Sequence, residues 1–133
     1  MAAQLVVSAM RKLILHTVLI LCALLAVRTA KSSQERKEIR SGSVDYVEMR
    51  QSGKEGKEIR LSSNQTEELT RQWNHARPIG LCKFYAKYLI TVHGKNGEAR
   101  SFRATEDTMK EENDYCFVVD DSYIESLWRS KQQ

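Results

Sequence analysis

Residues 84–105 read FYAKYLITVHGKNGEARSFRAT, and this stretch is the strongest indication of secondary structure in the chain. Two runs rich in β-branched and aromatic residues flank Asn96-Gly97, a dipeptide typical of tight hairpin turns. The sequence therefore predicts an antiparallel hairpin with strands at 84–93 and 98–105.

The register of this hairpin follows from where its apolar side chains must lie. A two-residue turn would divide them between the two faces of the hairpin. A three-residue loop at 95–97, with Gly97 in the left-handed conformation, pairs Ile90 with Phe102 and Tyr88 with Ala104. Because this register collects the apolar residues on one face, we expect the three-residue loop.

Helices are predicted on both sides of the hairpin. Ser62 or Ser63 caps the first helix, with Gln65 completing a capping box, and Pro78 ends it near residue 75 or 76. A second capping box, Ser122 with Glu125, begins a short helix at the C-terminus. Each helix has an apolar side, and the residues of these two sides are Thr66, Leu69, Trp73 and Ala76, then Ile124, Leu127 and Trp128.

Short strands are predicted at 44–50, 57–61 and 115–119, the first two joined by a turn from Gly53 to Gly56. Residues 78–81 and the acidic stretch 106–114 are predicted as loops. The fold class is therefore α+β: a small antiparallel sheet of four or five strands with two helices packed on one face. We expect this domain to occupy residues 44–133, after a flexible linker at 31–43.

The N-terminus carries an export signal in this interpretation. Residues 13–27 are uncharged and apolar and follow Arg11-Lys12, the layout of a secretory signal peptide over residues 1–30, with Met10 as a candidate true start. The alternative is an uncleaved membrane anchor formed by the same residues, although a spanning helix needs about 20 apolar residues. The protein is expected outside the cytoplasm, secreted or periplasmic, or anchored in a membrane.

The cysteine count agrees with export. Removal of the signal takes Cys22 and leaves Cys82 and Cys116, which we expect to form one disulfide in an oxidising compartment. Two free thiols are the alternative.

Composition excludes a nucleic-acid partner. The formal net charge is +4, but residues 31–133 hold 18 Lys and Arg against 17 Asp and Glu. That balance lacks the basic footprint that binding to backbone phosphates requires.

No motif of metal or cofactor chemistry stands out. Cys82, Cys116, His75 and His93 lack the close ligand pairs of structural zinc sites, so we expect no metal and no cofactor. The acidic stretch 106–114 lacks the regular spacing and internal glycine of a calcium-binding loop. Asn64 begins an Asn-Gln-Thr glycosylation pattern, which matters only in a eukaryotic secretory route.

Charge distribution is the one functional signal. From 71 to 103 there are seven basic residues and one acidic residue, whereas from 106 to 125 there are eight acidic residues and one basic residue. The two stretches either neutralise each other within the fold or present a dipolar surface that steers a partner.

These observations favour a small exported binding module over an enzyme. We expect it to contact a protein or envelope component, as an inhibitor, immunity factor or accessory subunit does, without catalysis. Contact with a membrane is expected only through the N-terminal segment, if that segment is uncleaved. The alternatives are a small extracytoplasmic enzyme with a site near His75, His93 and the 74–81 loop, and a membrane-anchored structural protein.

Overall fold

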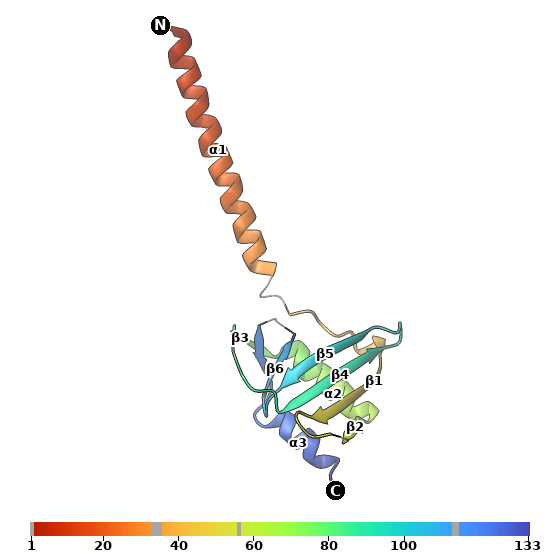
Figure 1. The fold of residues 1–133 in the computed structure, drawn as a ribbon. Coiled ribbons are helices and arrows are strands. Elements are labelled where there is room, and N and C mark those ends of the chain that lie inside the picture. Colours follow the sequence, from red (N-terminus) through yellow and green to blue (C-terminus); the bar gives the residue numbers. More distant parts are fainter. Residues whose placement is uncertain (1, 33–35, 56, 113–114) are drawn as a thin grey trace. The chain divides into compact units, whose positions relative to one another are not determined.

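The computed structural model describes residues 2–32, 36–55, 57–112 and 115–133, and of residues 24–32 the backbone alone. Two compact units, residues 1–35 and 36–133, are distinguished. Figure 1 shows the first as helix α1 and the second as a sheet with helices α2 and α3. The chain is an α+β protein.

The first unit consists of helix α1, Ala2–Ser32, which has no single apolar face. Its segment Ala2–Ala23 is long and apolar enough to cross a membrane, and none of that segment is buried. Because apolar side chains on all sides of a helix suit a lipid environment, α1 fits both the export signal and the anchor that its sequence predicts. The helix is longer than the predicted apolar run at 13–27.

The second unit is built on one antiparallel sheet of seven strands. Its spatial order is β2-β1-β4-β5-β6-β7-β3, so β2 and β3 are the edges. The strands are β1 (Val44–Gln51), β2 (Glu58–Arg60), β3 (Arg77–Gly80), β4 (Tyr88–Gly94), β5 (Ala99–Ala104), β6 (Thr108–Glu111) and β7 (Cys116–Val118). A short 3₁₀ turn, Ser41–Ser43, precedes β1.

The β4–β5 hairpin has the predicted register. Ile90 pairs with Phe102 and Tyr88 with Ala104, and Gly97 has a φ of 84°. All four paired side chains are buried. Period-two alternation therefore fixed this register as expected, although β4 begins at Tyr88 rather than at residue 84.

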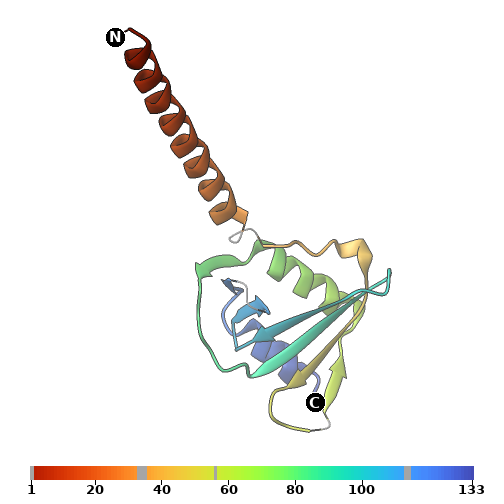
Figure 2. The same cartoon turned by 45° about the horizontal axis from the view of Figure 1, so that its top comes forward.

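Helices α2 (Ser63–His75) and α3 (Tyr123–Ser130) pack on the same face of the sheet, as Figure 2 shows. Trp73 of α2 contacts Phe102 and Phe117 edge-on, with ring centroids 4.8 and 5.1 Å away. Trp128 of α3 lies 5.6 Å from the ring of Tyr88. Both tryptophans are buried, so they form the core that the helical stripes predict.

The first capping box is confirmed and the second is wrong. The Ser62 hydroxyl accepts from the Gln65 amide, and the Gln65 side chain accepts from the Ser62 amide. Ser122 has a φ of 55° and makes no capping bond. The carbonyl of Glu106 instead accepts from the amides of Ile124 and Glu125, so a distant carbonyl takes up the free amides at the start of α3.

Two strands were missed by sequence pattern. Residues 77–80 form the edge strand β3, which pairs with β7, where the sequence predicted a loop at 78–81. The acidic stretch, also predicted as a loop, contains β6, which pairs with both β5 and β7. The sheet thus has seven strands rather than four or five. Gly56 and Asp114, which belong to the predicted turn and acidic loop, lie outside the described residues.

The domain begins earlier than residue 44. Ile39 is buried, and its backbone bonds both ends of the Asn74 side-chain amide. Trp73 Nε1 donates to the carbonyl of Lys37 at 3.0 Å. Residues 36–43, predicted as a linker, are therefore part of the folded domain.

Candidate functional site

The predicted disulfide is present between Cys82 and Cys116, with their Cα atoms 5.9 Å apart. Cys116 begins β7 and is fully buried. Cys82 belongs to the connection between β3 and β4, residues 81–87, which we call the strap. In Figure 2 the strap is a long extended connection on the outside of the domain. The disulfide fixes the start of this connection to the sheet.

Further contacts hold the strap along its length. Lys110 Nζ donates to the carbonyl of Cys82 at 3.4 Å and lies 5.2 Å from the ring centre of Phe84. At the end of the strap, the Lys87 amide donates to Ala104 and the Lys87 carbonyl accepts from Ser52. The strap is therefore a fixed extended segment, although it belongs to no strand.

Exposure alternates along the strap itself. Cys82, Phe84 and Ala86 are partly covered, whereas Leu81, Lys83 and Tyr85 are exposed. This is the period-two alternation of an extended chain. β3 adds the exposed Arg77 and Ile79, separated from the strap by Gly80 with its φ of 86°. We call the exposed set the strap row: Arg77, Ile79, Leu81, Lys83 and Tyr85.

The strap row exposes unusual apolar area. Ile79, Leu81 and Tyr85 have exposed fractions of 45, 76 and 99%. Within the described part of residues 36–133, they are the only large hydrophobic side chains in the exposed class. Single exposed apolar residues are ordinary, but three in one short fixed segment make this segment the candidate site.

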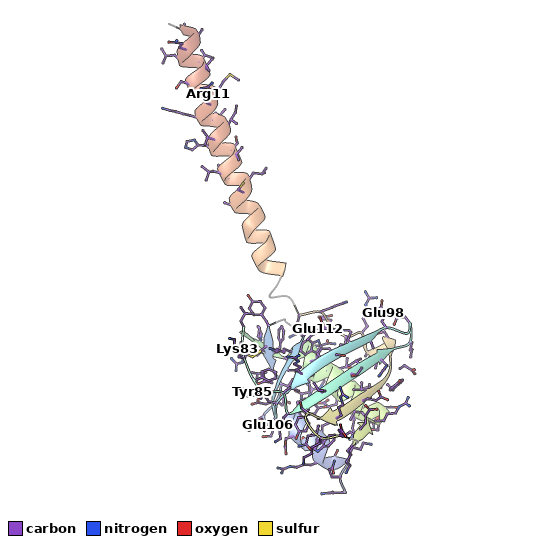
Figure 3. All side chains as sticks on the ribbon, in the orientation of Figure 1. Arg11, Lys83, Tyr85, Glu98, Glu106 and Glu112 are labelled. Carbon is purple, nitrogen blue, oxygen red and sulfur yellow. A yellow bond between two sulfur atoms is a disulfide. The ribbon has the colours of Figure 1, made fainter. Side chains whose placement is uncertain are left out.

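The charge of the strap row is basic. Arg77 and Lys83 are exposed, and the described residues hold no ion-pair partner for either. Figure 3 shows Lys83 and Tyr85 on the same side of the domain, away from Glu98 at the hairpin tip. The row therefore combines aliphatic, aromatic and cationic side chains and contains no carboxylate.

Lys87 closes the strap with an ion-pair cluster. Its Nζ lies 2.9 Å from Glu106 and 2.8 Å from Glu125, while the Tyr88 hydroxyl donates to Glu125. Bonds from Lys87 and then Tyr88 lower the pKa of Glu125 to about 2. Burial, followed by the bond to Glu125, raises the pKa of Tyr88 to about 12. These ion pairs hold the C-terminal end of the strap against the domain.

This cluster predicts a specific acid sensitivity. The pKa of Glu125 is depressed in the folded state, so its stabilisation is complete above the ordinary carboxyl pKa of about 4.3 and is lost as pH falls towards 2. Glu125→Gln should lower the free energy of unfolding by about 2 kcal/mol at pH 7, with the difference from wild type shrinking below pH 4. Urea unfolding at pH 7, 4 and 2.5 measures this.

Glu98→Gln is the matched control, because Glu98 is exposed at the hairpin tip. It should change stability by less than about 0.5 kcal/mol at every pH. A Glu125→Gln deficit that stays constant down to pH 2.5 would contradict the assigned pKa direction.

The two charge stretches partly neutralise each other. Lys87 pairs with Glu106 and Glu125, and Arg100 pairs with Glu111 at 2.7 Å. These contacts join the basic stretch 71–103 to the acidic stretch 106–125. The strap row therefore presents exposed positive charge and is not a dipolar surface.

The residues predicted for an enzyme site have separate surroundings. His75 is exposed at the end of α2 and bonds the Arg71 carbonyl. His93 stacks on Tyr46 with ring centroids 4.2 Å apart, and its Nε2 lies 2.9 Å from Glu48. No contact joins the two histidines among the described residues.

Metal ligands do not gather in the described ranges, where no group of three or more His, Cys, Asp or Glu side chains converges. The disulfide engages both sulfurs of the zinc set considered from sequence. In the acidic stretch, Glu106 and Glu111 bond Lys87 and Arg100 respectively. Asn64 is exposed in the first turn of α2.

Comparison with known proteins adds no assignment, because no protein-family model, curated protein or solved structure matches the chain. The strap row is thus defined by structure alone. From the sequence, Leu81 was expected at the end of a loop and Tyr85 in the first strand of the hairpin, so the alternation of Leu81, Lys83 and Tyr85 was the signal that was missed.

Proposed function

We propose that the protein is an extracytoplasmic binding module, without catalysis, that contacts its partner through the strap row. The observation that carries this proposal is the exposure of Ile79, Leu81 and Tyr85 on a segment fixed by a disulfide. Apolar and aromatic anchors presented on a rigid support bind with little loss of conformational entropy.

The disulfide and α1 support the location. Disulfides persist in oxidising compartments, and α1 has the length and composition of a signal or an anchor. Together they support a location outside the cytoplasm, with the domain either released or held at a membrane.

The edges of the sheet favour side-chain recognition over strand addition. β3 carries Pro78, which has no amide hydrogen to donate, and β2 has only three residues. Proline, charge and short length at an edge oppose pairing with another strand. The partner should therefore contact the strap row itself rather than extend the sheet.

Site-specific photo-crosslinking in the native host tests the proposal. A photoreactive phenylalanine analogue replaces Tyr85 or Leu81 in the full chain, and the same analogue at Glu98 is the control. We expect a discrete adduct, to a protein or to a lipid, from 85 and 81 and none from 98. With the purified partner, Leu81→Asp should then weaken binding at least tenfold.

Two results would overturn the proposal. One is the absence of any adduct from 81 and 85. The other is identical adducts from all three positions, because they would show collision rather than recognition.

A further inference from the structure

We infer that the strap row docks on the surface of an anionic lipid bilayer, the same bilayer in which α1 is inserted. This inference rests on the proposed binding role of the strap row, and it names the partner as lipid rather than protein. Three observations carry it: the composition of the row, its place next to the first residue of the domain, and the membrane-spanning character of α1.

The composition of the row suits a membrane interface. Tyr85 has an apolar ring and a polar hydroxyl, the combination that is enriched at the headgroup level of membranes. Ile79 and Leu81 supply aliphatic groups that gain free energy on leaving water. Arg77 and Lys83 supply positive charges that anionic headgroups attract.

The rigid geometry of the row allows its members to act together. Along the strap, an extended chain directs Leu81, Lys83 and Tyr85 to the same side, and the Cys82–Cys116 disulfide keeps the strap in place. A shallow lipid contact therefore requires little ordering of the protein. A mobile loop of the same composition would lose more entropy on docking.

The entry of the chain into the domain lies next to the row. The Arg36 guanidinium donates to the carbonyls of Asn74 and Ala76, the latter at 2.5 Å. Arg36 also lies over Phe117, which pairs with Pro78 of β3. The first described residue of the domain is therefore bonded to the residue that immediately precedes Arg77.

Chain length then limits the distance to the bilayer. The apolar span ends at Ala23, thirteen peptide steps before Arg36. At 3.6 Å each, these steps reach at most about 47 Å. A span retained in a membrane would therefore tether the strap row within that reach of the lipid, and tethering raises the effective concentration at which a weak affinity acts.

Quenching of tryptophan fluorescence by brominated lipids tests the inference. The full chain carrying Tyr85→Trp is reconstituted in vesicles of phosphatidylcholine with 30% phosphatidylglycerol, with brominated or ordinary acyl chains. The wild-type signal, which comes from the buried Trp73 and Trp128, is subtracted. Glu98→Trp is the matched control at the hairpin tip.

We expect the added tryptophan at 85 to lose at least half of its fluorescence in brominated anionic vesicles, and the tryptophan at 98 to lose less than a tenth. Replacing Arg77 and Lys83 with glutamine, raising salt to 1 M, or using pure phosphatidylcholine should each reduce the quenching at 85 at least twofold. Folding is checked by the unchanged signals of Trp73 and Trp128.

Equal quenching at 85 and 98, or none at 85, would overturn the inference. The proposed binding role is tested separately. A protein adduct from 85 with no quenching by lipid would support the binding role and exclude the bilayer as the partner. No adduct and no quenching would exclude both.

Discussion

Removal of the disulfide should destabilise the domain by about 4 kcal/mol. Cys82 and Cys116 are 34 residues apart in sequence, and closing a loop of that length restricts the unfolded chain by about this amount in the chain-entropy model. Net stabilities of small domains are about 5–15 kcal/mol, so Cys82→Ala with Cys116→Ala should lose a large share of its stability. Urea unfolding, with Cys22→Ser as the common background, measures this loss.

The same variant should release the strap before it affects the rest of the sheet. Amide hydrogen exchange at 82–86 should accelerate at least tenfold, while exchange in the β4–β5 hairpin should follow only the change in global stability. If the double variant fails to fold, reduction of the wild-type disulfide under native conditions gives the same readout. A loss below about 1 kcal/mol, with unchanged exchange in the strap, would contradict this account.

Trp73→Ala should cost about 3–5 kcal/mol, the range for large aromatic side chains removed from a core. Trp73 is 1% exposed, and its ring contacts Phe102 and Phe117 edge-on. Its Nε1 also donates to the carbonyl of Lys37. The tryptophan therefore joins α2 to the sheet and also to the segment that enters the domain.

Trp73→Phe separates these two contributions. It keeps an aromatic ring in the core but removes the donor to Lys37, so it should cost about 1–3 kcal/mol and expose residues 37–40 to faster exchange. Trp128→Phe, also a buried tryptophan, is the control and should leave exchange at 37–40 unchanged relative to global stability. Equal exchange at 37–40 in both variants would contradict the anchoring role of Trp73.

Sequence reasoning succeeded where neighbouring residues decide the structure. The β4–β5 register followed from alternation and from Asn96-Gly97, and the start of α2 followed from Ser62 and Gln65. In these elements the stabilising partners lie within a few residues or across one hairpin, so the pattern alone contains the information.

It failed where the partner is distant in sequence. β3 contains Pro78 and Gly80, which disfavour strands, and it forms because β7 pairs with it. The start of α3 is satisfied by the carbonyl of Glu106 rather than by Ser122. Neither partner can be identified from local pattern.

The candidate site was likewise only partly predictable from the sequence. The Cys82–Cys116 pairing was predictable because two cysteines remain after the export segment. The exposure of Leu81 and Tyr85 was not, because Leu81 ends a predicted loop and Tyr85 belongs to a run that resembles a half-buried strand. Only the positions of the disulfide and of β7 show that these side chains face outward.

The reactivity of Tyr85 in the native host shows whether a partner covers the strap row. Tyr85 is 99% exposed in the isolated chain, so its nitration or iodination should be fast in the purified protein. A reporter variant, Glu98→Tyr, supplies an exposed reference tyrosine at the hairpin tip. We expect modification of Tyr85 to be at least fivefold slower in intact cells than in solution, while the reference tyrosine keeps its rate. Equal rates for Tyr85 in cells and in solution would contradict a covered strap row.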